Sequence, residues 1–280
     1  MRHGHGGGGA PTLELILIGL AALAVLVYAS GMLTSRRQGR AWSTDRLGLW
    51  TLGIAAATAT VVGPLPEAAQ VDFVRHMAAH LSAGMLAPLL LVLAAPVTLA
   101  LRTLHVTPAR RISRLLRSAP VRFIAHPVTA GILSAGGLWL IYLTSIFEMM
   151  QAIPVLHVLV QGHLLLSGYV FTAAIIGRDP APHAPRWVLK AVVLVLAMAS
   201  HAVLAKHLYA HPPTGVPIGQ AHDGALLMYY GGAAIEVAIV VIFCAQWYRA
   251  AGRRLAPRSA DAPHTGDAHR TAPATMASAK

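Results

Sequence analysis

The sequence predicts an all-α membrane protein, a polytopic bundle of about seven transmembrane helices with its N-terminus outside the cell and its C-terminus in the cytoplasm. Composition is the first observation behind this fold class. Of the 280 residues, 56% are hydrophobic and only 11% are charged, whereas about 25% of the residues of an average soluble domain are charged. The second observation is that apolar residues form long runs, and the third is that arginine clusters lie between alternate pairs of these runs.

Seven apolar runs are candidates to cross about 30 Å of hydrocarbon at about 1.5 Å per helical residue. They are Pro11–Thr34, Leu47–Val62, Phe73–Leu101, Val128–Phe147, Pro154–Ile176, Trp187–Tyr209 and Ala225–Trp247. The second run is the shortest, and the third is long enough to tilt. Pro88 and Pro96 are expected to bend the third run, because a proline has no N–H to donate.

The first run ends at a cluster of Arg36, Arg37 and Arg40, and this cluster predicts the orientation of the whole chain. A cleavable signal peptide has a shorter apolar stretch that follows its positive charges, so this run is expected to remain as a helix with the N-terminus outside. The loops then assigned to the cytoplasm carry nearly all of the 22 lysine and arginine residues, as cytoplasmic loops do. The exceptions are Arg2, Arg75 and Lys206. A count of six or eight helices would place arginine-rich loops on the wrong side.

Three regions follow from these assignments. Residues 1–10 are predicted to be a flexible extracytoplasmic N-terminus and residues 11–248 the seven-helix transmembrane domain. Residues 249–280 are predicted to be a disordered cytoplasmic tail, because they are rich in small and polar residues without an apolar period. We interpret the arginine-rich segment 102–122 as a solvated loop or an interfacial helix on anionic lipid.

Charge and cysteine content exclude two classes of function. The net charge of +12 does not indicate nucleic-acid binding, because the charges lie between apolar runs and not on one folded face with exposed aromatic residues. The single cysteine, Cys244, leaves no disulfide framework and no CxxC redox pair. Any metal site must therefore use histidine, methionine and carboxylate side chains.

Eight histidines fall in or above the predicted outer leaflet. They are His76, His80, His157, His163, His201, His207, His211 and His222. Ionisable groups in lipid usually face the bundle interior, a partner or a water-filled pocket. Measured from the outer helix ends, His80, His163 and His201 each lie about 10–13 Å deep. Three helices would thus present imidazoles at one depth, and imidazole is a ligand that suits copper and zinc.

Further residues extend this predicted metal site. His76 and His80 are spaced i, i+4 on one helix face, and Asp72 lies one turn earlier, so together they form an access route. Weaker candidate ligands are Asp72, Met77, His207, Asp223 and Glu236. The alternative for each histidine is a hydrogen bond to a neighbouring helix that fixes packing, and the alternative for Met77 is core packing. The N-terminal Met1-Arg2-His3 is a separate candidate chelate for Cu(II) or Ni(II).

Several motifs resemble those of one protein family. The segment Arg75–Leu81 has the spacing His-Met-x-x-His, and it continues through Ala87–Leu91 to Ala95 and Pro96. The matching residues that follow are His157, His163, Ser167–Phe171, Gly177–Pro182, His201, Ala202, Asp223, Gly231, Gly232 and Glu236. In this combination, over residues 45–248, the sequence resembles the multi-spanning CtaG family of cytochrome c oxidase assembly factors. The resemblance does not extend to Lys206, His207 and His211, where the outer rim of this chain is richer in histidine.

The resemblance implies a non-enzymatic role in maturing a haem-copper oxidase, with cytochrome c oxidase subunits as partners and copper as the metal handled. His80, His163 and His201 are then the inner ligands, and His76 and His157 are relay ligands. The protein is expected in the cell membrane as a multi-pass protein, and the sequence leaves homo-oligomerisation open.

Three other functions compete with this reading. A copper importer or exporter would need ligands in the cytoplasmic halves of the helices, where few occur. A haem-b electron carrier could use His80 and His163 as axial ligands, but a second histidine pair in the inner leaflet is missing. A retinal-type receptor is the weakest alternative, because its one candidate lysine, Lys206, lies at the interface.

Overall fold

The computed structural model describes residues 9–177 and 185–255, and these residues form helices and connecting turns without any β-strand. Within this part of the chain, five stretches are long and apolar enough to cross a membrane. They are Thr12–Arg37, Phe73–Thr103, Val155–Ile176, Trp187–Ala210 and Ile218–Gly252. A sixth is reached if the helices Pro127–Leu143 and Ile146–Ala152, which meet at 77°, are counted as one bent span. The all-helical polytopic class is confirmed.

The count of seven spans stays a prediction, because the second run forms a helix that is short for a membrane span. This run becomes helix α2 (Thr44–Thr58), which has 15 residues, and at about 1.5 Å per residue it is too short to cross about 30 Å of hydrocarbon on its own. The other predicted spans correspond to α1 (Gly9–Arg37), α12 (Pro154–Ile176), α13 (Trp187–Ala210), α14 (Ile218–Leu255) and two segmented helices.

The third predicted run is divided into four pieces. They are α4 (Phe73–Leu81), the π-helical turn η1 (Ser82–Leu86), α5 (Ala87–Ala94) and α6 (Pro96–Thr103). The break between α5 and α6 lies at Ala95, which is left-handed with φ 54° and ψ 57°. Its cause is Pro96, because a proline disfavours the α-helical conformation in the residue before it. Pro88 lies in the first turn of α5, directly after η1.

The remaining helices are short. The fourth predicted run is α9 (Pro127–Gly131), the π-helical turn η2 (Ile132–Gly136), α10 (Gly137–Leu143) and, after the bend, α11 (Ile146–Ala152). The connections contain α3 (Pro64–Ala69), α7 (Val106–Leu116) and α8 (Ala119–Ile124). Helix α14 is longer at both ends than the predicted run Ala225–Trp247.

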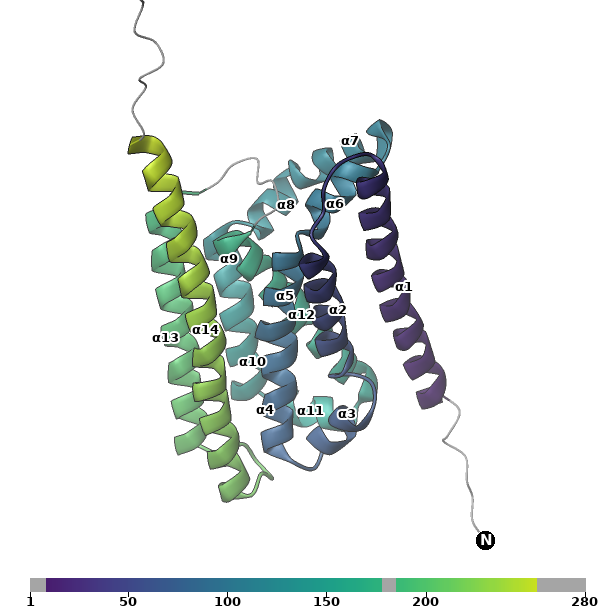
Figure 1. The fold of residues 1–280 in the computed structure, drawn as a ribbon. Helices are drawn as coiled ribbons and strands as arrows, with labels where there is room; N and C mark the ends of the chain where they lie inside the picture. Colours follow the sequence, from purple (N-terminus) through teal and green to yellow (C-terminus); the bar gives the residue numbers. More distant parts are fainter. Residues whose placement is uncertain (1–8, 178–184, 256–280) are drawn as a thin grey trace, which may run out of the picture.

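Figure 1 shows the arrangement of the bundle. Helices α4, α5, α10 and α12 lie at its centre, α13 and α14 pack together on one side, and α1 lies at the opposite edge against α2 and α6. We call the end with α3 and α11 the α11 end, and the end with α6, α7 and α8 the α7 end. Helices α1 and α14 both start at the α11 end and finish at the α7 end.

The two ends of the bundle differ in charge. Arg36 and Arg37 in the last turn of α1 lie at the α7 end together with the arginines of α7 and α8. This gathering agrees with the charge pattern read from the sequence, although which end faces the cytoplasm stays a prediction.

The predicted boundaries of the terminal regions need correction where they are described. Residues 249–255 belong to α14 and not to a disordered tail, and residues 9 and 10 belong to α1. The rest of the predicted tail, the first eight residues with His3, and residues 178–184, which include positions 178–182 of the Gly177–Pro182 motif, lie outside the described residues.

Close packing at glycines holds the centre of the bundle together. A Cβ atom added to Gly168 of α12 would overlap the backbone carbonyl oxygen of Gly84 in η1. Between α2 and α5, a Cβ on Gly53 would lie 2.9 Å from the side chain of Leu91. Such small-residue contacts are typical of membrane helices, which gain little from burying apolar surface and associate through close approach.

Candidate functional site

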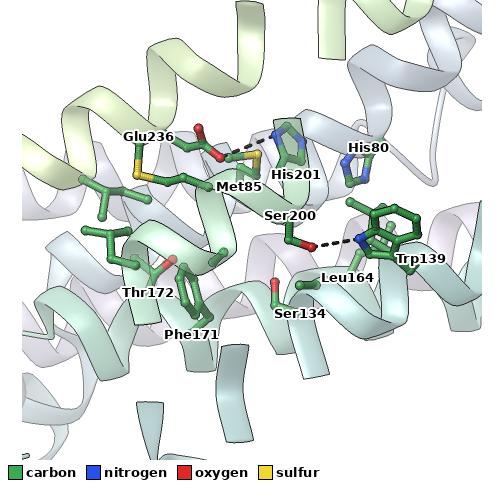
Figure 2. A pocket seen from close by; sticks show the side chains of 17 residues that line it. His80, Met85, Ser134, Trp139, Leu164, Phe171, Thr172, Ser200, His201 and Glu236 are labelled. Atoms are coloured by element: carbon green, nitrogen blue, oxygen red, sulfur yellow. Dashed lines mark hydrogen bonds and ion pairs between the residues drawn. The ribbon is translucent and has the colours of Figure 1, made fainter. Parts of the chain in front are cut away.

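A small cavity of about 70 Å³ lies between α4, η1, η2, α10, α12, α13 and α14 (Figure 2). Its walls are mainly apolar, with a few polar side chains that converge on it. The polar members of its lining are His80, Ser134, Trp139, Thr172, Ser200, His201 and Glu236. One water needs about 10–15 Å³ of such space, so the cavity has room for several waters or one small ion.

Both π-helical turns contribute to the cavity. Gly84 and Met85 of η1 and Ser134 of η2 lie in its wall. A π-helical turn adds a residue to the helix and is frequent at functional sites. Two such turns, in two different helices, therefore make this cavity the candidate functional site.

His201 and Glu236 form a pair between α13 and α14. Nδ1 of His201 lies 3.5 Å from Oε1 of Glu236, and the two side chains are only 10% and 11% exposed. Figure 2 shows this pair beside His80, and Met85 lines the same cavity. The carboxylate thus lies at one edge of the His201 ring, and the other ring nitrogen, Nε2, has no hydrogen-bond partner among the described residues.

Three imidazole nitrogens at this cavity have no hydrogen-bond partner among the described residues. They are Nδ1 and Nε2 of His80 and Nε2 of His201, and His80 as a whole is only 4% exposed. The two ring centroids are 6.2 Å apart, with 31° between the ring planes. A buried polar atom without a partner costs about 1–3 kcal/mol, so these atoms are ready to bind a ligand.

His76 differs from His80 because its ring has a hydrogen-bond partner within the protein. Its Nε2 lies 3.1 Å from the hydroxyl of Tyr142, and its ring stacks on Phe73 and meets the edge of Phe147. The Tyr142 hydroxyl also donates to the sulfur of Met77 at 3.7 Å. His76 is therefore part of an aromatic cluster on the α11 side of His80, formed with Phe73, Tyr142 and Phe147.

The structure does not bring His163 to His80 and His201. His163 is exposed, and its ring lies against Gly137 of α10, while the neighbouring Leu164 lines the cavity. His163 directly precedes Leu164 in α12, and its side chain therefore points about 100° away from that of Leu164 around the helix, the rotation of one residue. The expected three-histidine cluster is therefore not formed, and within the described residues no three His, Cys, Asp or Glu side chains are grouped to hold a metal ion.

The other candidate ligands lie outside the cavity. Nε2 of His157 is 3.5 Å from the carbonyl oxygen of Thr60. Asp72 caps α4 by accepting from the N–H groups of Val74 and Arg75. Met77 is fully buried in the core, Asp223 is exposed, and the His207 ring stacks on His211. Among the weaker candidates, only Glu236 lies at the cavity.

Comparison with known proteins identifies the family. The sequence model of the family described as cytochrome c oxidase caa3 assembly factor (Caa3_CtaG) matches residues 26–250, which include all of the cavity. The chain belongs to the CtaG family. The resemblance seen in the sequence is thereby confirmed, and the role of this family is cytochrome c oxidase assembly.

Curated relatives of this CtaG protein come from mycobacteria. An uncharacterised protein of Mycobacterium leprae is 34% identical over 194 residues, and one of Mycobacterium tuberculosis is 36% identical over the same length. In both cases the match covers 66% of this chain and 29% of the relative, so this chain spans less than a third of the length of these relatives. No solved structure gives a significant match.

Sequence reasoning missed four of the polar residues that line the cavity, Ser134, Trp139, Thr172 and Ser200. Nε1 of Trp139 donates to Oγ of Ser200 at 2.8 Å, and both side chains form the wall between α10 and α13. Ser200 directly precedes His201 in an apolar run. A polar residue beside a membrane histidine was the signal that could have indicated a second polar wall.

Gly232 of α14 offers a test of the His201–Glu236 pair. A Cβ at this position would collide with the His201 ring, with only 2.9 Å to Nδ1. If copper binds at this cavity, as proposed below, we expect Gly232→Ala to turn His201 away from Glu236 and to weaken copper binding by about 10–100-fold, the usual effect of losing an outer-shell partner. Isothermal titration of detergent-purified protein with copper measures this change.

Gly219→Ala is the matched control for Gly232→Ala, because a Cβ on Gly219 of the same helix meets nothing within 4 Å. Equal affinities for the two alanine variants would contradict a role for the His201 ring position.

Proposed function

We propose that this protein is a cytochrome c oxidase assembly factor of the cell membrane that binds a copper ion between His80 and His201 and helps to deliver it to an oxidase subunit. The printed description of its family supports the assembly role. The copper ion is the cargo in this proposal, and the protein has no catalytic role. The observation that carries the copper site is the set of three unpaired imidazole nitrogens at one cavity.

The spacing of the two rings supports a shared ion. A metal–nitrogen bond is about 2 Å long, and a ring nitrogen lies about 1.1 Å from its ring centroid. Two imidazoles on opposite sides of one ion therefore have centroids about 6.2 Å apart, and the distance between His80 and His201 is 6.2 Å. Helix movement is not needed to bring the rings to this separation.

The surroundings suit a metal that is bound and then passed on. Imidazole nitrogen and thioether sulfur are both ligands that copper accepts, and the thioether of Met85 lines the same cavity. Glu236 orients His201 through Nδ1, as outer-shell carboxylates do in metal sites. Two strong ligands hold an ion without enclosing it, which leaves positions for an incoming ligand of the partner.

The cavity is a poor fit for the two main alternatives. Pockets for drug-sized ligands have about 300–1,000 Å³, and a haem is at least as large, so a cavity of about 70 Å³ does not accommodate one. A transporter needs a path to the other side of the membrane. Between the cavity and the α7 end, the bundle is filled by buried apolar side chains that include Val92, Ile176 and Phe243.

Metal analysis of detergent-purified protein with an optical spectrum tests the proposal. We expect one equivalent of copper in the wild type and in His163→Ala, because His163 faces away from the cavity, and none in the double variant His80→Ala, His201→Ala. A Soret band would instead indicate haem. Copper that persists in the double variant, or that is lost equally in His163→Ala, would contradict the site.

Oxidase assembly needs its own measurement, because copper binding alone does not show delivery. Cells that carry the double variant are expected to lose cytochrome c oxidase activity while the variant protein is still present in the membrane. Normal oxidase activity in these cells would contradict the delivery role, whatever the copper content of the purified protein.

A further inference from the structure

A second pair of histidines lies outside the cavity, at the α11 end of α13. His207 is in the last turn of the helix, and His211 follows its last residue as the C-cap. The two rings stack with centroids 4.7 Å apart and 23° between their planes. His211 is exposed and His207 is half-buried. Neither ring has a hydrogen bond to any other described residue, so the pair has no evident structural partner beyond Trp139.

We propose that His207 and His211 form a second metal site, a surface chelate for a divalent transition-metal ion, with Cu(II) bound most tightly. Side chains at i and i+4 lie on one face of a helix, and two histidines at this spacing are a recurrent metal-binding pair. Imidazole binds such ions in the Irving–Williams order, in which Cu(II) exceeds Ni(II) and Zn(II).

The ring spacing matches a chelate and differs from that of the inner pair. With metal–nitrogen bonds of about 2 Å, two rings that meet at one ion at about 90–110° have centroids about 4.4–5.1 Å apart. The distance of 4.7 Å falls in this range, and because the stacked ring planes are nearly parallel, each ring must turn about its side-chain bonds until one of its nitrogens points at the ion. The 6.2 Å between His80 and His201 fits ligands on opposite sides of an ion. One helix carries both rings, so the geometry does not depend on packing between helices.

The end of the helix favours a cation at this place. The last carbonyl groups of a helix have no intrahelical partner, and together they carry a partial negative charge. In α13 the N–H of His211 bonds to the carbonyl of His207 at 2.8 Å, which keeps both side chains on the last turn. The neighbouring Lys206 lies with its Nζ 5.5 Å from the Tyr229 ring of α14, on the side of α13 that packs against α14.

The surface pair and the inner cavity share a wall. The Trp139 ring lies 6.2 Å from the His207 ring, donates to Ser200 and lines the cavity. Trp139 therefore separates two sites on the same helix. The surface site does not depend on the proposed inner site, and each can be removed without the other.

Cu(II) titration of the detergent-purified full chain tests the surface site, with electron paramagnetic resonance as the readout of nitrogen ligands. The starting protein carries His3→Ala to remove the N-terminal chelate, and His80→Ala with His201→Ala to remove the inner pair. In this background we expect one Cu(II) per chain with a two-nitrogen spectrum. Zn(II) in competition is expected to displace it only at large excess.

The variants His207→Ala, His211→Ala and the double variant distinguish a chelate from two separate ligands. In a chelate the second ring acts at high effective concentration, so each single variant is expected to lose on the order of 100-fold in affinity. The double variant is expected to lose little more. Both positions lie at a helix end, and gel filtration checks that each variant is folded.

His222→Ala is the matched control, because this histidine also lies at the α11 end but stacks on Tyr209 at 4.1 Å. It is expected to leave Cu(II) affinity unchanged. Additive losses in the two single variants, an equal loss in His222→Ala, or an absence of Cu(II) binding in the starting protein would each overturn the proposal.

Discussion

Alanine at position 168 is expected to leave little folded protein. Gly168 of α12 faces the backbone of Gly84, and its new methyl group would overlap the carbonyl oxygen of that residue. A side chain in the way could rotate, but a backbone carbonyl moves only with its helix. Overpacking of a core costs about 1–3 kcal/mol, and a clash with backbone belongs at or above the upper end of this range.

The yield of monodisperse protein after gel filtration, and its thermal unfolding in detergent, measure this effect. Gly162→Ala is the control on the same helix, because a Cβ there meets nothing within 4 Å; the better helix propensity of alanine is expected to leave stability unchanged or raised by up to about 1 kcal/mol. Similar stability of the two variants would show that α12 and η1 do not approach as closely as described.

Leucine at position 80 is expected to separate stability from copper binding. The two nitrogens of His80 have no hydrogen-bond partner among the described residues. A buried polar atom without a partner costs about 1–3 kcal/mol, and leucine removes both atoms at little change in volume. The metal-free variant should therefore be at least as stable as the wild type. Copper at 100 times its dissociation constant stabilises a binding protein by about 2.7 kcal/mol, and we expect the variant to lose this gain completely.

Thermal unfolding with and without copper measures both effects of His80→Leu. His76→Leu is the matched control on the same helix, because the Tyr142 hydroxyl lies 3.1 Å from its Nε2 and losing a hydrogen bond costs about 0.5–1.5 kcal/mol. It is expected to be less stable in both conditions. A metal-free His80→Leu protein that is less stable than the wild type would instead indicate a packing role for His80.

If both predictions hold, the unpaired nitrogens of His80 lower the stability of the metal-free protein and are needed for copper binding. The close contact at Gly84 and Gly168 fixes η1, and η1 places Met85 in the cavity wall one turn after His80. The variant Gly168→Ala should then lose copper binding together with the fold, whereas His80→Leu should lose copper binding alone.

The sequence by itself determined the fold class and the separation of basic residues to one end. These properties depend on hydrophobicity and on the fixed rise per residue of a helix. The bounds Pro154–Ile176 were predicted as observed, as was the start of α13 at Trp187. The interruption before Pro96 follows from local sterics and was also predictable.

Only the tertiary structure decided which side chains meet. His80 and His201 lie together at the cavity with Glu236, but His163, which was predicted at a similar depth, faces Gly137 on the outside. Depth follows from counting residues, whereas the direction of a side chain depends on how each helix is rotated in the bundle. The π-helical turns η1 and η2 change the direction of the side chains part-way along two helices. The hydrophobic pattern of the sequence does not indicate this change, because the packing of neighbouring helices produces it.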